Sequence, residues 1–282
     1  MPDLIITGVP RSGTTLAAAI IDQTPNCLCL SEPDNHVDLM NGAASPEDFV
    51  SRLCREFETV RRTILSGGSV LDRRSADGAP VTDYFSDPLS DGRRELAVTT
   101  RGIHRSRLSP DFVLGVKHNA LYTAVLPEIV QSGRFRVIAI IRDPVSVLMS
   151  WQMLDLPISR GRLPAGERFW PELAALGRAD LDLTDKQIRI CDLLLYRYGQ
   201  LADRIAVIPY EVFTTDPAQL LAAARIPQPM PSQIIAIVRP TPSRDDGDRQ
   251  KPPLAAQIRQ LIAAGQLPGI ARYYPHYGPE AR

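Results

Sequence analysis

The sequence lacks the features that would mark a nucleic-acid-binding or membrane protein. Lysine plus arginine and aspartate plus glutamate number 32 each in 282 residues, so no net charge draws the chain toward nucleic acid or a lipid surface. No apolar run approaches the roughly 20 residues of a membrane-spanning helix, and no basic leader with an apolar core precedes the first strand-like residues. We therefore expect a cytoplasmic protein whose partners include neither nucleic acid nor a membrane.

Cysteine is also scarce, which narrows the chemistry further. The chain has four cysteines, at Cys27, Cys29, Cys54 and Cys191. Their spacing fits neither a zinc site nor a dense disulfide framework, so we expect buried free thiols and no metal centre. No internal repeat is present, whereas 44% of the residues are hydrophobic, which is enough to build a large core.

What the chain does contain is a set of short apolar runs that alternate with helix-like segments. The five runs are 3–7 (DLIIT), 26–30 (NCLCL), 112–117 (FVLGVK), 135–141 (FRVIAII) and 205–209 (IAVIP). Runs of this length read as buried strands, and their alternation with helical periodicity is typical of parallel sheets. The sequence therefore predicts an α/β fold in which helices flank both faces of a parallel sheet.

Two helices are predicted with particular clarity. Ser45 caps the first and Pro46 opens it, whereas the second begins at Thr184 with Gln187 three residues on, a capping-box pattern. The apolar stripes of the two helices are Phe49, Leu53, Phe57, Val60 and Ile64, and then Ile188, Cys191, Leu195, Tyr198 and Leu201. We interpret both as core helices that carry no chemistry.

Two stretches break the regular pattern. Residues 66–110 are rich in Gly, Asp, Ser and Arg, and residues 154–182 include LPISRGRLPAGERFW. Loops of this length in a compact domain are usually functional lids or disordered insertions, and we expect these two to form the acceptor side of the site. We expect one domain over 1–282 with irregular insertions at about 66–110 and 154–182, and an aromatic C-terminal segment, YYPHYGPEAR, docked on its body.

The segment GVPRSGTT, residues 8–15, is built like a loop that holds an anion. It joins an apolar strand to a helix, so the backbone N–H groups from about Arg11 to Thr15 can converge at the positive end of that helix. Gly8 and Gly13 let the backbone turn tightly. The phosphate-loop pattern GxxxxGK[ST] requires a lysine at position 14, however, and this chain has Thr14.

GVPRSGTTL resembles the 5′-phosphosulfate loop of the sulfotransferases that use 3′-phosphoadenosine 5′-phosphosulfate (PAPS), in which no loop lysine is expected at that position. The resemblance implies a P-loop-like three-layer sandwich in which Arg11 lies beside the leaving group. It implies further that the 5′-phosphosulfate of PAPS is bound by Pro10, Arg11, Ser12, Gly13, Thr14 and Thr15. PAPS would be the donor co-substrate, without a metal.

A second motif, IIRDPVSVLMSW, resembles the family's signature for the 3′-phosphate of the donor. Arg142 ends a strand and Ser150 follows eight residues later. A forked guanidinium and a hydroxyl suit a single phosphate. A weaker similarity, VIPYEVFTTDP, implies that Tyr210 flanks the adenine, and the family's C-terminal phosphate-binding loop would fall near Ser243, Arg244 and Lys251.

Two residues compete for the role of general base. Glu32 ends the second strand next to the phosphate loop, and the run from RSGTTL through SEP resembles the tyrosylprotein branch of the family, whose catalytic glutamate falls at this place. His118 follows a strand-end lysine, as in the small-molecule branch, but there one residue separates the pair, whereas Lys117 and His118 are adjacent. We favour Glu32 as a base of near-normal pKa, with Lys117 facing the transferring group or the acceptor.

The resemblance implies a sulfotransferase that moves a sulfuryl group from PAPS to a hydroxyl or amine by in-line displacement. The alternatives are a magnesium-dependent P-loop phosphotransferase, with Asp143 as metal ligand, and a nucleotide-binding module without catalysis. The acceptor stays open among small molecules, glycans and peptides, as does the oligomeric state. An anionic acceptor would be met by Arg73, Arg74, Arg93, Arg94, Arg101, Arg105, Arg107, Arg160 and Arg162, in the two irregular stretches.

Overall fold

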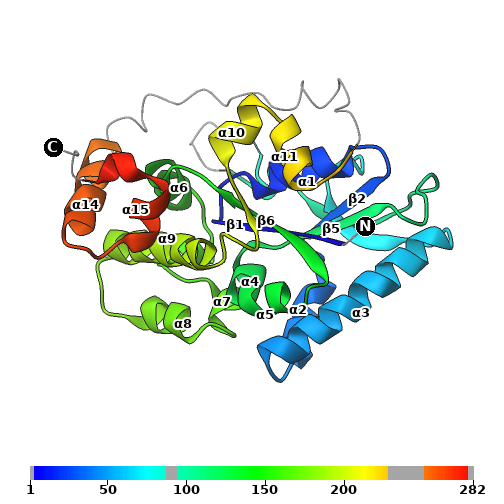
Figure 1. The fold of residues 1–282 in the computed structure, drawn as a ribbon, viewed down its shortest axis with the longest axis horizontal. Helices are drawn as coiled ribbons and strands as arrows, with labels where there is room; N and C mark the ends of the chain where they lie inside the picture. The colour runs from blue at the N-terminus through cyan, green and yellow to red at the C-terminus, as the bar shows by residue number, and fades with distance from the viewer. Residues whose placement is uncertain (1–2, 87–93, 228–250, 279–282) are drawn as a thin grey trace.

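The molecule is organised around a parallel five-stranded sheet (Figure 1). The computed structural model describes residues 3–86, 94–227 and 251–278. The strand order is β2-β5-β1-β6-β7, and every neighbouring pair is parallel. The strands are β1 (Asp3–Gly8), β2 (Cys27–Ser31), β5 (Val113–Lys117), β6 (Phe135–Ile141) and β7 (Ala206–Pro209). All five strands predicted from the apolar runs are therefore confirmed, as is the α/β class.

Helices cover both faces of this sheet, which accounts for the nearly continuous apolar character of its strands. One face packs against α1 (Thr14–Asp22), α10 (Tyr210–Thr215) and α11 (Ala218–Ala223). The opposite face packs against α3 (Pro46–Leu65), α4 (Asn119–Ala124), α5 (Leu126–Gln131), α6 (Pro144–Gln152) and α9 (Leu183–Gln200). The result is a three-layer sandwich with β1 at its centre (Figure 1).

The order of the strands decides where a ligand can bind. From β1 the chain passes through α1 to the edge strand β2, whereas β6 lies on the other side of β1. In open α/β sheets such a reversal leaves a crevice at the carboxyl ends of the strands, where ligands bind. Because all five strands are parallel, the segments after β1, β2, β5 and β6 meet at this one edge.

The two long core helices are present, and one of them begins differently from the prediction. The Ser45 hydroxyl caps α3 by accepting a hydrogen bond from Asp48 N (3.2 Å), and the predicted apolar stripe is buried. Helix α9 is capped by the Asp182 carboxylate, which accepts from Thr184 N (2.9 Å), so the predicted start at Thr184 is wrong. A carboxylate directly before the helix is the better acceptor for its free N–H groups. Leu201, expected in the stripe, ends the helix half-buried.

The stretches 66–110 and 154–182 contain more regular structure than the sequence indicates. In the first, β3 (Val70–Arg74) and β4 (Thr99–Ile103) form an antiparallel hairpin. The second holds a 3₁₀ turn (Pro157–Arg160), α7 (Pro164–Glu167) and α8 (Pro171–Arg178). Helix α2 (Asn35–Gly42) connects β2 to α3.

The C-terminal segment docks on the body, as predicted, within the part that the structure describes. It forms α14 (Lys251–Ala263), α15 (Pro268–Tyr273) and a 3₁₀ turn (Pro275–Tyr277). Tyr274 and Tyr277 are buried, and the Tyr277 hydroxyl donates a hydrogen bond to Asp143 Oδ2 (2.7 Å). This contact joins the end of the chain to the start of α6.

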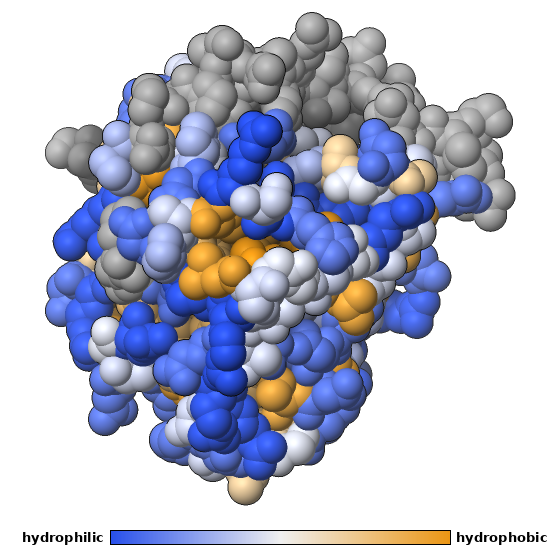
Figure 2. Space-filling model, turned by 90° about the vertical axis from the view of Figure 1, so that its right-hand side faces the viewer, coloured by the Kyte–Doolittle hydropathy of each residue, from blue (hydrophilic) through white to orange (hydrophobic). Residues whose placement is uncertain are grey.

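The thiols are buried or half-buried, and the surface of the molecule is largely polar on the side that Figure 2 shows. All four cysteines are free, and three of them are buried while Cys54 is half-buried. Among the described helices, none is long and apolar enough to span a bilayer. The side of the molecule at the right of Figure 1 is mostly hydrophilic, with apolar residues in small patches (Figure 2).

Candidate functional site

The loop between β1 and α1 is shaped by its two glycines and by the ring of Tyr210. Gly13 has φ +90°, and a Cβ at this position would lie 2.4 Å from Tyr210 Cδ2, so only glycine lets the ring pack here. Within the described part of the chain, no side chain caps α1 at Gly13, and the first N–H groups of a helix have no partner within it. The N-terminus of α1 therefore offers unpaired N–H donors to an anion.

The hydroxyl of Ser12 is committed to the fold. Ser12 is fully buried, its Oγ donates to Ile140 O (2.8 Å), and its N–H donates to Val9 O (3.0 Å). Ser12 therefore ties the loop to β6, whereas Thr15 is half-buried on the first turn of α1. Thr14 is buried, and its methyl group packs toward Gly8.

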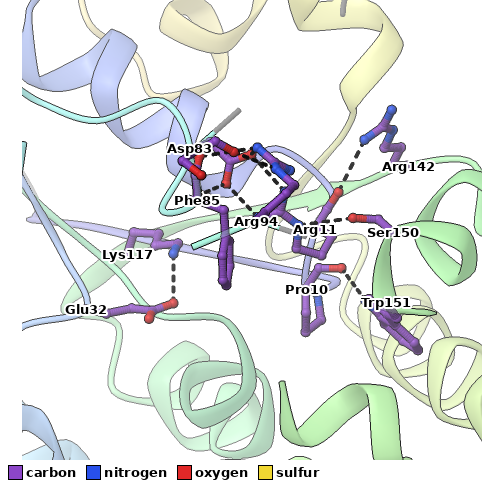
Figure 3. A network of polar contacts seen from close by, with 11 residues as sticks. Pro10, Arg11, Glu32, Asp83, Phe85, Arg94, Lys117, Arg142, Ser150 and Trp151 are labelled. Carbon is purple, nitrogen blue, oxygen red and sulfur yellow. Dashed lines mark hydrogen bonds and ion pairs between the residues drawn. The ribbon is translucent and has the colours of Figure 1, made fainter. Parts of the chain in front are cut away.

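Arg11 is the most heavily bonded side chain of the loop (Figure 3). Its Nε donates to Ser150 Oγ (3.1 Å), and both of its terminal nitrogens donate to the Asp83 carboxylate, at 2.8 Å each. The guanidinium also lies 5.4 Å from the centre of the Phe85 ring. Arg11 itself has φ +71°, a conformation that non-glycine residues seldom adopt. Residues with such strained backbone are found most often at functional sites.

The second sequence motif meets the loop at Arg11. Arg142 NH1 donates to Arg11 O (3.5 Å), and its guanidinium stacks 4.4 Å from the centre of the Tyr210 ring. Trp151, next to Ser150 on α6, donates from Nε1 to Pro10 O (2.8 Å). The structure thus brings together Arg11, Arg142, Ser150 and Tyr210, which lie up to 199 positions apart in the chain. The first three of these side chains are shown in Figure 3.

Glu32 and Lys117 form an ion pair at the ends of β2 and β5. Lys117 Nζ is 2.7 Å from Glu32 Oε1, and Arg73 NH1 is 3.3 Å from Glu32 Oε2. The side chain of Lys117 is buried, with Nζ 4.5 Å from the centre of the Tyr84 ring. Burial alone would raise the pKa of Glu32, but the neighbouring positive charges, that of Lys117 foremost, lower it to about 2. The near-normal pKa expected from the sequence is therefore wrong.

His118 lies beside this pair but makes no hydrogen bond with it. Its Nδ1 is buried and has no hydrogen-bond partner among the described residues, and its ring lies 5.6 Å from that of Tyr122. Burial lowers the pKa of His118 to about 4, and the charge of Glu32 only partly opposes the shift. Tyr122 is in turn hydrogen-bonded to His36 Nδ1 (2.7 Å). His118 is thus a neutral imidazole in an aromatic setting at neutral pH.

Comparison with known proteins decides the family. The sulfotransferase domain family matches residues 1–158, more than half of the chain. The chain belongs to the sulfotransferase domain family. The matched region spans the phosphate loop, Glu32, Lys117, Arg142 and Ser150, and ends before Tyr210.

Two solved structures resemble this sulfotransferase-family chain at low identity. A sulfotransferase from Alicyclobacillus acidocaldarius is 16% identical over 98% of this chain and 96% of that one, with a TM-score of 0.42. Sulfotransferase STF9 from Mycobacterium avium is 15% identical over 93% of this chain and 76% of that one, with a TM-score of 0.41. No curated protein sequence matches the chain significantly.

Two residues of the candidate site carry no sequence signal. Asp83 and Phe85 lie in a stretch without a recognisable motif, and only the folded chain brings them to Arg11. Arg94, considered from the sequence only as a contact for an anionic acceptor, pairs with Asp83. Of the nine arginines considered for an acidic acceptor, six form ion pairs with carboxylates of this same chain. These are Arg73, Arg74, Arg94, Arg105, Arg160 and Arg162. Arg93 lies outside the described residues, as do Ser243 and Arg244.

Proposed function

We propose that this protein transfers a sulfuryl group from PAPS to a hydroxyl or amine of an acceptor. One observation carries the proposal: Arg142 and Ser150, a pair suited to one phosphate, both contact Arg11 at the uncapped N-terminus of α1. A donor with anionic groups at both its 5′ and 3′ positions has the chemistry to match two such anion-binding elements. An ordinary adenine nucleotide would leave one of them unused.

The residues at this edge fit the donor in charge and in shape. The free N–H groups at the start of α1 and the guanidinium of Arg11 suit the phosphosulfate, and Arg142 with Ser150 suits the 3′-phosphate. The Tyr210 ring, packed on Gly13 and under Arg142, offers an aromatic surface for the adenine. Lys251 opens α14, but its side chain lies outside the described part of the structure, so its contact with the donor stays a prediction.

The donor supplies an activated sulfuryl group, and the side chains of this protein supply positive charge and a base. Arg11 and Lys117 are the cations suited to the negative charge that develops on the leaving oxygen and the sulfuryl oxygens. Glu32 is the proposed acceptor of the proton. In its ion pair with Lys117 the carboxylate is too weakly basic for that task at neutral pH, because its pKa is about 2. We infer that Glu32 separates from Lys117 when both substrates are bound.

The magnesium-dependent alternative is weakened by the bonding of Asp143. Its Oδ1 accepts hydrogen bonds from Ser146 N (2.9 Å) and Ser146 Oγ (3.0 Å), and its Oδ2 accepts one from Tyr277. Asp143 therefore acts as the cap of α6. A non-catalytic binding module, the third candidate, would have no use for a buried lysine paired with a carboxylate at the ligand edge.

The reaction itself is tested by following the conversion of PAPS to 3′-phosphoadenosine 5′-phosphate in the presence of a library of hydroxyl and amine compounds. Acceptor-dependent conversion by the wild-type protein is expected, without added magnesium and with Mg-ATP inert as donor. Phosphoryl transfer from Mg-ATP would instead support the phosphotransferase. Tight donor binding with no conversion for any acceptor would support the non-catalytic module.

A further inference from the structure

Asp83 lies between two guanidinium groups at the mouth of the phosphate loop. Its carboxylate accepts hydrogen bonds from both terminal nitrogens of Arg11, at 2.8 Å each, and Arg94 NH2 lies 2.9 Å from Asp83 Oδ2. Burial alone would raise the pKa of Asp83, but these two arginines lower it to about 2, so the carboxylate is ionised throughout the neutral range. Figure 3 shows Asp83 and Ser150 on opposite sides of the Arg11 guanidinium.

This arrangement conflicts with the role proposed for Arg11. The two terminal nitrogens of Arg11 are both bonded to Asp83, so they are not available to the leaving group of the donor. Two arginines that converge on one anion are also well suited to bind a phosphate or sulfate group. The carboxylate thus stands where an anionic group of a ligand would be bound.

The backbone beside Asp83 is held in place, and besides its two arginines the Asp83 carboxylate accepts a hydrogen bond from Phe85 N (3.2 Å). Tyr84 is buried and bonded to Ser31 (2.8 Å between the hydroxyl oxygens), and its carbonyl accepts from Ala97 N (2.7 Å). The side chain of Asp83 itself is 31% exposed, so its carboxylate has an open path to solvent. Release of Arg11 therefore requires the carboxylate to turn about its side-chain bonds and to give up its contacts with Arg11, Arg94 and Phe85 N.

We propose that Asp83 is an internal counter-anion of the phosphate loop, exchanged for the anionic group of the donor on binding. Asp83 then keeps Arg11 and Arg94 in place in the free protein and lowers the affinity for every anion that competes for the same two guanidinium groups. The identity of that anion as PAPS rests on the function proposed above, but the exchange does not.

Calorimetric titrations of the full chain test the exchange. The ligands are 3′-phosphoadenosine 5′-phosphate and, separately, inorganic pyrophosphate, and the proteins are wild type, Asp83→Asn, Asp83→Ala and the control Asp180→Asn. Asp180 is exposed, so its variant makes the same change in net charge away from the loop. Both Asp83 variants should bind each ligand about tenfold more tightly, a factor in keeping with a partly exposed ion pair removed from competition, whereas Asp180→Asn should match wild type.

The pathway through Arg11 is tested by the double variant Arg11→Ala/Asp83→Asn. If Asp83 acts by occupying Arg11, the tenfold gain should shrink in the Arg11→Ala background to the part that the release of Arg94 contributes. Unchanged or weaker binding in Asp83→Asn and Asp83→Ala, with native circular dichroism, would overturn the proposal and make Asp83 a residue that orients Arg11 for the ligand. Because pyrophosphate has no adenosine or 3′-phosphate, failure of the PAPS assignment alone would abolish selectivity for the nucleotide and leave the pyrophosphate result intact.

Discussion

At the scale of single residues, Arg11 is central to the proposed transfer step. In the proposed function the charge of Arg11 stabilises the leaving group, whereas the N–H groups at the start of α1 bind the ground state. Arg11→Ala is therefore expected to lower the single-turnover rate by more than it weakens the binding of 3′-phosphoadenosine 5′-phosphate. Rapid-quench kinetics and calorimetry on the same variant measure the two effects. Lost affinity with an unchanged rate would assign Arg11 to ground-state binding.

Substitutions of Glu32 and His118 distinguish the two candidates for the general base. Glu32→Gln should cut turnover by roughly 100- to 10,000-fold while donor binding is kept, because the amide preserves shape and loses basicity. His118→Ala should cost much less, since no hydrogen bond connects its ring to the ion pair. Steady-state rates with an identified acceptor measure both, and a dead His118→Ala beside an active Glu32→Gln would identify His118 as the base.

The pH profile of the wild type provides a second test of the same residue. A base must be deprotonated to act, so kcat/KM falls as the pH drops through the pKa of the free protein's base. With the pKa of Glu32 lowered to about 2, kcat/KM should stay level from about pH 7 to about pH 5. A fall centred near about 6.5, the ordinary value for histidine, would contradict a carboxylate base.

At the scale of elements, the β3–β4 hairpin is attached to the sheet by buried charges. Arg74 NH1 lies 2.8 Å from Asp22 Oδ2 on α1, and Arg74 Nε lies 2.5 Å from Asp72 Oδ2. Asp72 in turn accepts from Ser31 N (2.7 Å), the residue before Glu32. All three charged side chains are at most 2% exposed. Removal of the arginine would therefore leave two carboxylates without their main buried partner.

Arg74→Met is expected to lower the free energy of unfolding by about 3 to 5 kcal/mol, the usual range for breaking a buried ion pair on one side. Burial already raises the pKa of Asp72 to about 6. Below that pH the Asp72 carboxyl is protonated, so the folded variant no longer buries an unpaired negative charge there. The loss should accordingly be smaller at about pH 5 than at about pH 8. Urea denaturation measures it, with Arg101→Met on the exposed part of the same hairpin as control. A loss equal to that of the control would refute the role of these charges.

The hairpin also explains what sequence reasoning misses. The parallel strands β1, β2, β5 and β6 could be predicted because both of their faces are buried and mostly apolar, whereas β7 is half-buried and is recognised by its short apolar run. In β3 the inward-facing residues are Asp72 and Arg74, whereas Leu71 is exposed, so its pattern is the reverse of the alternation that predicts a strand. The burial of Arg74 depends on Asp22, 52 positions away in the chain, and no local pattern reports that pairing.

At the scale of the whole molecule, the candidate site is assembled from both the family-matched part and the rest of the chain. Residues 1–158 supply the loop, Glu32, Lys117, Arg142 and Ser150. The remainder supplies Tyr210 and the C-terminal helices, of which α14 contacts α6 and α15 packs against α9. Motifs at strand ends were predictable because parallel strands bring their carboxyl ends to one edge. The partners of these motifs, such as Asp83 on Arg11 and Arg73 on Glu32, depend on tertiary packing.

The central claim, a donor with both a 5′ and a 3′ anionic group, is tested most directly by the nucleotide preference of the wild type and of Arg142→Ala. Calorimetry should give much tighter binding of 3′-phosphoadenosine 5′-phosphate than of 5′-AMP, by roughly 10- to 150-fold for each charge-assisted contact worth about 1.5 to 3 kcal/mol. Arg142→Ala should erase most of this preference and leave the affinity for 5′-AMP nearly unchanged. Equal affinities of the wild-type protein for the two nucleotides would contradict the account.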